Sequence, residues 1–205
     1  MSKELQMVML IERDYPLPLY LTPKGEMTKE EFYEFCIANS HLRIERDEHN
    51  QIWIMAPVGG DTGNKHIEIV FAIEQWNKQK KLGKTFDSST GFELPDRSMR
   101  SPDVSWITNE KWNSLSEEEK DRFLPFAPDF AVEVFSPTDK MPAAQSKMHK
   151  WIQNGTRLAW LIVPKQQLAF IYRMDGTVDK IEGFKKKLSG ENVLPGLEFD
   201  LTVLL

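Results

Sequence analysis

Two acidic residues stand in strand-like segments where an apolar residue would be expected. Glu133 lies in the middle of the run FAVEVF, and Asp103 follows Pro102 in SPDVSW. Successive residues of a strand point to opposite faces, so each acid faces away from its apolar neighbours. If the two strands are neighbours in a sheet, both carboxylates project from one side of it.

Two carboxylates held close together in a partly buried site repel each other, and a divalent cation removes that repulsion. Hard oxygen ligands suit Mg²⁺ or Mn²⁺. Such an ion can position a water molecule and stabilise the charge that develops during phosphodiester hydrolysis. The reaction also requires a positive charge near the attacking water, and a lysine supplies a compact one.

Lys147 is the best-placed lysine of the segment that follows Glu133. Ala143, Ala144 and Trp151 surround it on one face of the predicted helix, which indicates that this face packs on the sheet. From there a lysine can reach past the small alanines toward the two acids. Lys150 lies to the side and is the second candidate.

Each of these residues also has a purely structural interpretation. Asp103 could open a strand after a proline, and Lys147 could lie along an apolar face with its ammonium in water. A salt bridge to Lys147 alone would satisfy Glu133 without any metal.

The periodicity of apolar residues predicts the elements that must position these side chains. Prolines at 16, 18 and 23 predict an irregular N-terminal arm over residues 1–25. Thr28 and Glu31 form a capping box for a helix over 29–39. Further along, the pattern predicts a hairpin over 42–57, a helix over 64–80, strands over 85–93, 102–108 and 129–135, a polar helix or loop over 110–122, a helix capped by Thr138 or Asp139 that ends at 154–155, a strand over 158–163, a hairpin over 168–181, and a final edge strand or docked tail over 194–205.

This order of elements predicts an α/β fold in which a mixed sheet carries flanking helices, with extra β-hairpins at both ends. Residues 1–205 are expected to form a single domain. The content of 40% apolar and 28% charged residues is ordinary for a soluble globular protein. The lone Cys36 excludes an intramolecular disulfide and a cysteine-based zinc site.

The charge and the missing motifs narrow the function. A net charge of −5 counts mildly against a nucleic-acid-binding role. Basic runs such as NKQKKLGK could still form a local binding surface, but they could equally be ordinary solvent-exposed faces. The sequence contains no Gly-rich phosphate loop, HExxH motif or Ser-His-Asp order. It has neither an apolar run long enough to span a membrane nor a signal pattern, so a cytoplasmic protein is expected.

The ordered set of motifs resembles the Uma-two family of restriction endonucleases, within the PD-(D/E)XK nuclease superfamily. The likeness covers residues 27–197 and rests on MTKEEF, RIERDEHNQIWIMAP, a histidine that opens a helix, SPDVSWI, APDFAVEVFSP, NGTRLAWLIVP and LPGLEF. It implies a restriction-endonuclease-like fold and a Mg²⁺-dependent endonuclease that acts on DNA. Asp103, Glu133 and the backbone carbonyl of Val134 would bind the ion, and Lys147 would orient the water.

One position departs from the superfamily pattern, which places a lysine two residues after the second acid. Phe135 occupies that position, but in the Uma-type pattern the following helix supplies the lysine, and Lys147 matches its place. Glu45 matches the acid of the family's first hairpin. His66 lies on the core-facing side of its helix, whereas Glu68 lies on the solvent-facing side.

Several alternatives stay open from sequence alone. Glu45 could be part of a surface cross-strand pair, and His66 could be a satisfied, partly buried histidine. The whole chain could also be a catalytically inactive nuclease-like domain that binds nucleic acid or protein. Exposed strand segments near both ends could pair between subunits, and a homodimer would suit the cleavage of both DNA strands.

Overall fold

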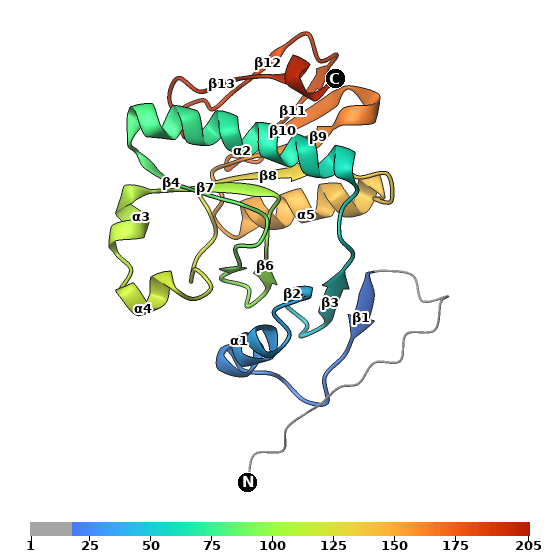
Figure 1. Ribbon diagram of the computed structural model, residues 1–205, viewed down its shortest axis with the longest axis vertical. Helices are drawn as coiled ribbons and strands as arrows, with labels where there is room; N and C mark the ends of the chain where they lie inside the picture. Colours follow the sequence, from blue (N-terminus) through green and yellow to red (C-terminus); the bar gives the residue numbers. More distant parts are fainter. Residues whose placement is uncertain (1–17) are drawn as a thin grey trace.

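The structure is a computed structural model that describes residues 18–205 (Figure 1). The sequence predicted an irregular arm over residues 1–25. Positions 1–17 of that arm lie outside the described residues, and positions 18–25 contain a strand. β1 (Leu19–Leu21) pairs antiparallel with β3 (Ile52–Met55). Pro18 and Pro23 flank this strand and so leave its hydrogen-bonding groups intact, and β1 lies at a sheet edge, where such prolines are tolerated.

The N-terminal sheet has five strands in the order β1-β3-β2-β6-β5. The remaining strands are β2 (Arg43–Arg46), β5 (Phe92–Glu93) and β6 (Met99–Arg100). The predicted hairpin is present as β2 and β3, and α1 (Lys29–Ala38) begins at the predicted capping box. Phe32 of α1 is buried against apolar side chains of these strands, among them Ile44 and Ile54.

The central sheet has six strands in the order β11-β10-β9-β8-β7-β4. They are β4 (Gly83–Phe86), β7 (Val104–Thr108), β8 (Phe130–Val134), β9 (Leu158–Val163), β10 (Leu168–Arg173) and β11 (Val178–Glu182). All neighbours are antiparallel except β8 and β9, which are parallel. Parallel neighbours require a crossover, and α5 (Met141–Gln153) supplies it. The predicted mixed sheet with flanking helices is therefore confirmed.

Two helices cover opposite faces of this sheet, α2 (Gly60–Lys80) on one side and α5 on the other (Figure 1). Ile69 and Ile73 of α2 pack in a core with Val132 and other residues of the same face. Met148 of α5 packs in a second core that includes Ala131. Successive side chains of β8 therefore point alternately into the two cores, as the period of two in its sequence predicted.

The other elements lie at the edges of these layers. They are the helices α3 (Asn109–Asn113) and α4 (Glu117–Lys120), the 3-10 turns η1 (Pro164–Gln166) and η2 (Leu201–Leu204), and the hairpin of β12 (Lys187–Ser189) and β13 (Glu198–Asp200). This C-terminal hairpin adds Leu188 and Phe199 to the core beneath α2. No helix within residues 18–205 is long and apolar enough to cross a membrane.

Some predicted boundaries were wrong for local reasons. The strand expected over 85–93 is two strands in different sheets, because Asp87 accepts hydrogen bonds from Ser89 in a turn between them. α5 begins after Lys140, so neither Thr138 nor Asp139 caps it. The side chain of Asp139 instead accepts a hydrogen bond from the Ser136 N–H in the preceding turn. α2 begins at Gly60, four residues before the predicted start.

Candidate active site

The two acids meet where β7 and β8 run side by side. These strands are antiparallel with Val104 opposite Val132, and extending that register by one residue places Asp103 opposite Glu133. Asp103 lies just before β7 and not within it. Its Oδ2 accepts a hydrogen bond of 2.8 Å from the Val134 N–H. Asp103 therefore lies at the sheet end, beside the end of β8 that carries Glu133.

Glu133 faces α5, which provides two donors to its carboxylate. Lys147 Nζ lies 2.9 Å from Oε1 and 3.0 Å from Oε2. The indole Nε1–H of Trp151 donates to Oε1 at 2.9 Å. The two donors are four residues apart and so lie on one face of the helix. Glu133 is buried, so its charge depends on these contacts.

Glu45 comes from the N-terminal sheet and is the most buried of the three acids, with 1% of its surface exposed. Its Oε2 lies 3.2 Å from an Arg100 guanidinium nitrogen, and its Oε1 accepts from the Ser101 N–H at 3.2 Å. Lys147 Nζ lies 3.5 Å from the same Oε1. Lys147 thus bridges Glu45 and Glu133, one from each sheet.

Two further side chains approach Asp103. His66 on α2 is buried, and its Nε2 lies 3.5 Å from Asp103 Oδ2. A guanidinium nitrogen of Arg43 on β2 lies 3.4 Å from Oδ1 and also donates to the Ser101 carbonyl at 3.2 Å. The Asp103 carboxylate therefore accepts from the backbone of β8 and is approached from both α2 and β2.

Burial and neighbouring charges shift the pKa values of this cluster. Burial raises the pKa of Glu133 to about 7; Lys147 opposes this shift, and the negative charge of Asp103 adds to it. Burial also raises the pKa of Glu45, but Lys147 and Arg100 outweigh it and leave this pKa below its usual value. Of these two acids, Glu133 is the one whose negative charge is less compensated.

The two basic groups that titrate in the cluster shift in opposite directions. Burial lowers the pKa of Lys147, but the carboxylates of Glu133 and Glu45 outweigh it and raise this pKa above its usual value. Burial lowers the pKa of His66, and Asp103 only partly opposes this effect. Lys147 is therefore held as an ammonium, whereas the neutral form of His66 is favoured.

The structure brings five predicted residues together: Asp103, Glu133, Lys147, Glu45 and His66. The interpretation of Glu45 as a surface pair is wrong, because its cross-strand partner Arg100 is buried with it.

The other candidates lie elsewhere. Lys150 pairs with Glu48 and with Asp96, the latter at 3.2 Å. Phe135, at the usual lysine position, packs against the core beneath α5. Ala143 is exposed, so Ala144 is the alanine that packs on the sheet beside Lys147.

Three contributions were not predicted from the sequence: the cations of Arg43 and Arg100, and the indole donor of Trp151. Arg43 could have been predicted, because the alternation of side chains along its strand places it on the same polar face as Glu45. Arg100 lies in the two-residue strand β6, which is too short to show a period.

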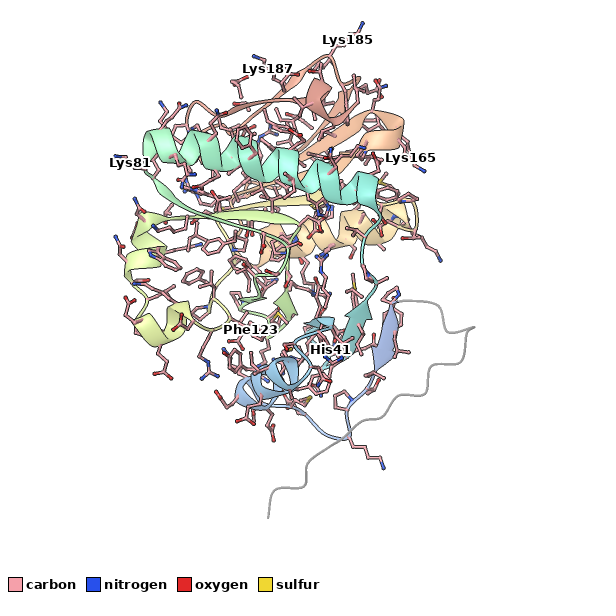
Figure 2. All side chains as sticks on the ribbon, in the orientation of Figure 1. His41, Lys81, Phe123, Lys165, Lys185 and Lys187 are labelled. Atoms are coloured by element: carbon pink, nitrogen blue, oxygen red, sulfur yellow. The ribbon has the colours of Figure 1, made fainter. Side chains whose placement is uncertain are left out.

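The lysine-rich runs lie apart from this cluster. Figure 2 shows Lys81, Lys185 and Lys187 extending from the outer edge of the molecule, and all three are exposed. They belong to the end of α2 and to the segment around β12, so these runs form solvated faces.

The acid cluster has the donor chemistry that a hard divalent cation prefers. Asp103 and Glu133 supply carboxylate oxygens, and the raised pKa of Glu133 reflects a burial and a like charge that a bound cation would relieve. Within residues 18–205, no three Asp, Glu, His or Cys side chains already surround one point as a complete metal cage. The residues therefore fit an ion held by two side chains and further oxygen ligands.

Comparison with known proteins identifies the fold and the family of the chain. The chain is similar to a putative nuclease belonging to DUF820 from Anabaena variabilis ATCC 29413, with 21% identity and a TM-score of 0.65 over 78% of this chain and 88% of that chain. A likeness at this level of identity shows the shared fold. No curated protein matches the chain. The Uma2 (Uma-two) family, described as "Putative restriction endonuclease", matches residues 29–203, and the protein therefore belongs to this family.

Proposed function

We propose that the protein is a metal-dependent endonuclease that hydrolyses phosphodiester bonds of DNA. The observation that carries the proposal is the meeting of Asp103 and Glu133 at adjoining strand ends, with Lys147 in contact with Glu133. Membership in a family described as restriction endonucleases supports the same chemistry. Two acids at the sheet end and a lysine from α5 are groups that suit metal-assisted phosphodiester hydrolysis.

Asp103 and Glu133 would hold Mg²⁺ or Mn²⁺, together with the backbone carbonyl of Val134. The ion would lower the pKa of a bound water and neutralise charge on the phosphate. Lys147 would orient the attacking water and stabilise the negative charge of the phosphate. This ammonium stays charged at neutral pH, because the carboxylates around it raise its pKa.

Glu45 and His66 would hold Lys147 and Asp103, respectively, in position. Glu45 is fixed by Arg100 and the Ser101 N–H, so it can hold Lys147 when Glu133 binds an ion. His66 lies against Asp103 and limits its rotation. Both roles are supporting ones, because neither side chain has to touch the reacting phosphate.

Cleavage of supercoiled plasmid tests the proposal directly. The purified protein should nick plasmid in Mg²⁺ or Mn²⁺ and not in EDTA, and Glu133→Gln should abolish the nicking. Glu68→Gln is the matched control, because Glu68 lies two residues from His66 and so on the opposite side of α2. Nicking that persists in Glu133→Gln would refute the assignment of the site.

A catalytically inactive nuclease-like domain that binds nucleic acid or protein is the second candidate. Two observations favour it: Lys147 and Trp151 already donate to Glu133 without any ion, and Phe135 fills the usual lysine position. Calorimetry separates the two functions. The absence of Mg²⁺ and Mn²⁺ binding at millimolar concentrations would favour the inactive domain.

We also propose that residues 1–205 form one domain and that the protein is a homodimer. The edge strand β11 of the central sheet is exposed along most of its length and could pair with the same strand of a second copy. Sedimentation equilibrium should then give twice the mass of the chain. A single cooperative unfolding transition would support the single domain, and two separated transitions would contradict it.

A further inference from the structure

The hydrogen bond of Trp151 differs from those of the other buried tryptophans in the described chain. Its indole N–H donates to the carboxylate of Glu133, and its side chain is completely buried. Trp76 donates to a backbone carbonyl and Trp106 to a side-chain amide oxygen. Trp160 Nε1 has no partner within residues 18–205. Trp151 is therefore the buried indole that bears directly on the acid cluster.

The two donors to Glu133 would respond differently to a bound cation. The ammonium of Lys147 is positive and must compete with a divalent ion for the same carboxylate. The indole N–H of Trp151 is neutral, so it can keep its hydrogen bond when an ion binds. Trp151 donates to Oε1, whereas Lys147 Nζ contacts both carboxylate oxygens, Oε1 at 2.9 Å and Oε2 at 3.0 Å. Displacement of Lys147 toward Glu45 by an ion would free Oε2 and would leave Oε1 with the hydrogen bond from Trp151.

The ring of Trp151 is itself held in place by packing. It lies in the core between α5 and the sheet, together with Met148, Ala131 and Leu161. A fully buried ring in such a core has little freedom to rotate. Its N–H group therefore points at Glu133 as a fixed feature of the fold.

We propose that Trp151 is a positioning residue that holds the Glu133 carboxylate in the orientation that binds the divalent ion. This inference rests on the proposed function, because it assumes that Glu133 is a metal ligand. Groups that hydrogen-bond to a metal-binding side chain fix its orientation, and their removal weakens metal affinity by roughly 10–100-fold. Trp151 would act through Glu133, because its indole N–H donates to that carboxylate.

The test compares Trp151→Phe with Trp160→Phe. Both variants replace a fully buried indole by a smaller ring, but only the first removes a hydrogen bond. Calorimetric titration with Mn²⁺ and no DNA should give roughly 10–100-fold weaker binding for Trp151→Phe. Trp160→Phe should bind like the unaltered protein. At saturating Mn²⁺, Trp151→Phe should recover most of its nicking rate, because its defect lies in holding the ion.

The outcomes distinguish this inference from the proposed function. If the unaltered protein binds Mn²⁺ and both variants bind it equally well, the role of Trp151 is refuted and the nuclease assignment stands. If the unaltered protein binds no Mn²⁺ at all, both are refuted.

A second measurement needs no tryptophan variant and covers the case in which Trp151→Phe does not fold. In the NMR spectrum of the unaltered protein, the indole N–H signal of Trp151 is identified by its shift in Glu133→Gln. This signal should move on addition of Mg²⁺ and remain protected from exchange with water. Loss of that protection on Mg²⁺ binding would overturn the inference.

Discussion

Replacement of Glu133 by glutamine is expected to stabilise the metal-free protein above pH 7 while it removes the proposed metal ligand. The glutamine side chain would resemble the protonated acid in shape, and its amide oxygen could still accept from Trp151. Lys147 would keep Glu45 as a partner at 3.5 Å. The variant therefore removes a poorly compensated negative charge and leaves most of the packing unchanged.

The magnitude follows from the pKa of Glu133, which burial raises from 4.5 to about 7. The folded protein then keeps this proton to a higher pH than the unfolded chain does. The free energy of unfolding of the unaltered protein should fall as the pH rises from 4.5 through about 7. The difference between the two pKa values corresponds to a loss of up to about 3 kcal/mol. Glu133→Gln avoids this loss.

Urea unfolding in EDTA at pH 5 and pH 8 measures the effect. The variant should be more stable by less than about 1 kcal/mol at pH 5, where the unfolded chain has already lost most of the Glu133 proton, and by up to about 3 kcal/mol at pH 8. His66, whose pKa is lowered by burial, makes both proteins more stable as the pH rises through 6.5, so its contribution cancels in the difference. An advantage of the variant that is the same at both pH values, or that is larger at pH 5, would refute the reasoning.

Three further predictions test the site and the fold by substitution. Lys147→Met should abolish plasmid nicking while Lys150→Met retains it, because only the first ammonium contacts the acids of the site; equal loss in both would contradict this assignment. Asn77→Ala should lower the free energy of unfolding, measured in urea, by about 3 kcal/mol, because it leaves the Trp106 indole N–H and the N–H and C=O of Gly83 without their partners. Gly83→Ala should lower it by about 3 kcal/mol as well, since the added Cβ would lie 1.9 Å from a carbonyl oxygen of β7, and an unchanged urea midpoint would show that the backbone can shift there.

Much of the fold could be predicted because its elements follow regular periods. The alternation in FAVEVF predicted strand β8, and the capping box at Thr28 predicted the start of α1. That the strands of Asp103 and Glu133 are neighbours was a condition of the predicted site, and the pairing of β7 with β8 meets it. Lys147 could be chosen because helical spacing places it on the same side as Trp151.

The missing parts of the site depend on contacts between distant segments. Arg100 meets Glu45 only because β6 pairs with β2, and a pair of two-residue length leaves no pattern in the sequence. Asp103 was expected to project from the sheet face, but it precedes β7 and accepts from the Val134 N–H. That hydrogen bond depends on the register of two strands, which local sequence does not specify.

The placement of Lys147 and Trp151 on α5 limits which sequence changes the protein can tolerate in and under this helix. Each added or removed residue turns a helix by about 100° and shifts it by about 1.5 Å. The charge and the indole that meet Glu133 therefore depend on how α5 seats against the sheet, through Met148 and its neighbours in the core. Phe135 packs against that core and takes no part in the proposed chemistry. Changes in the apolar core under α5 should therefore impair the proposed nuclease activity before they unfold the protein, so that activity would report on the packing.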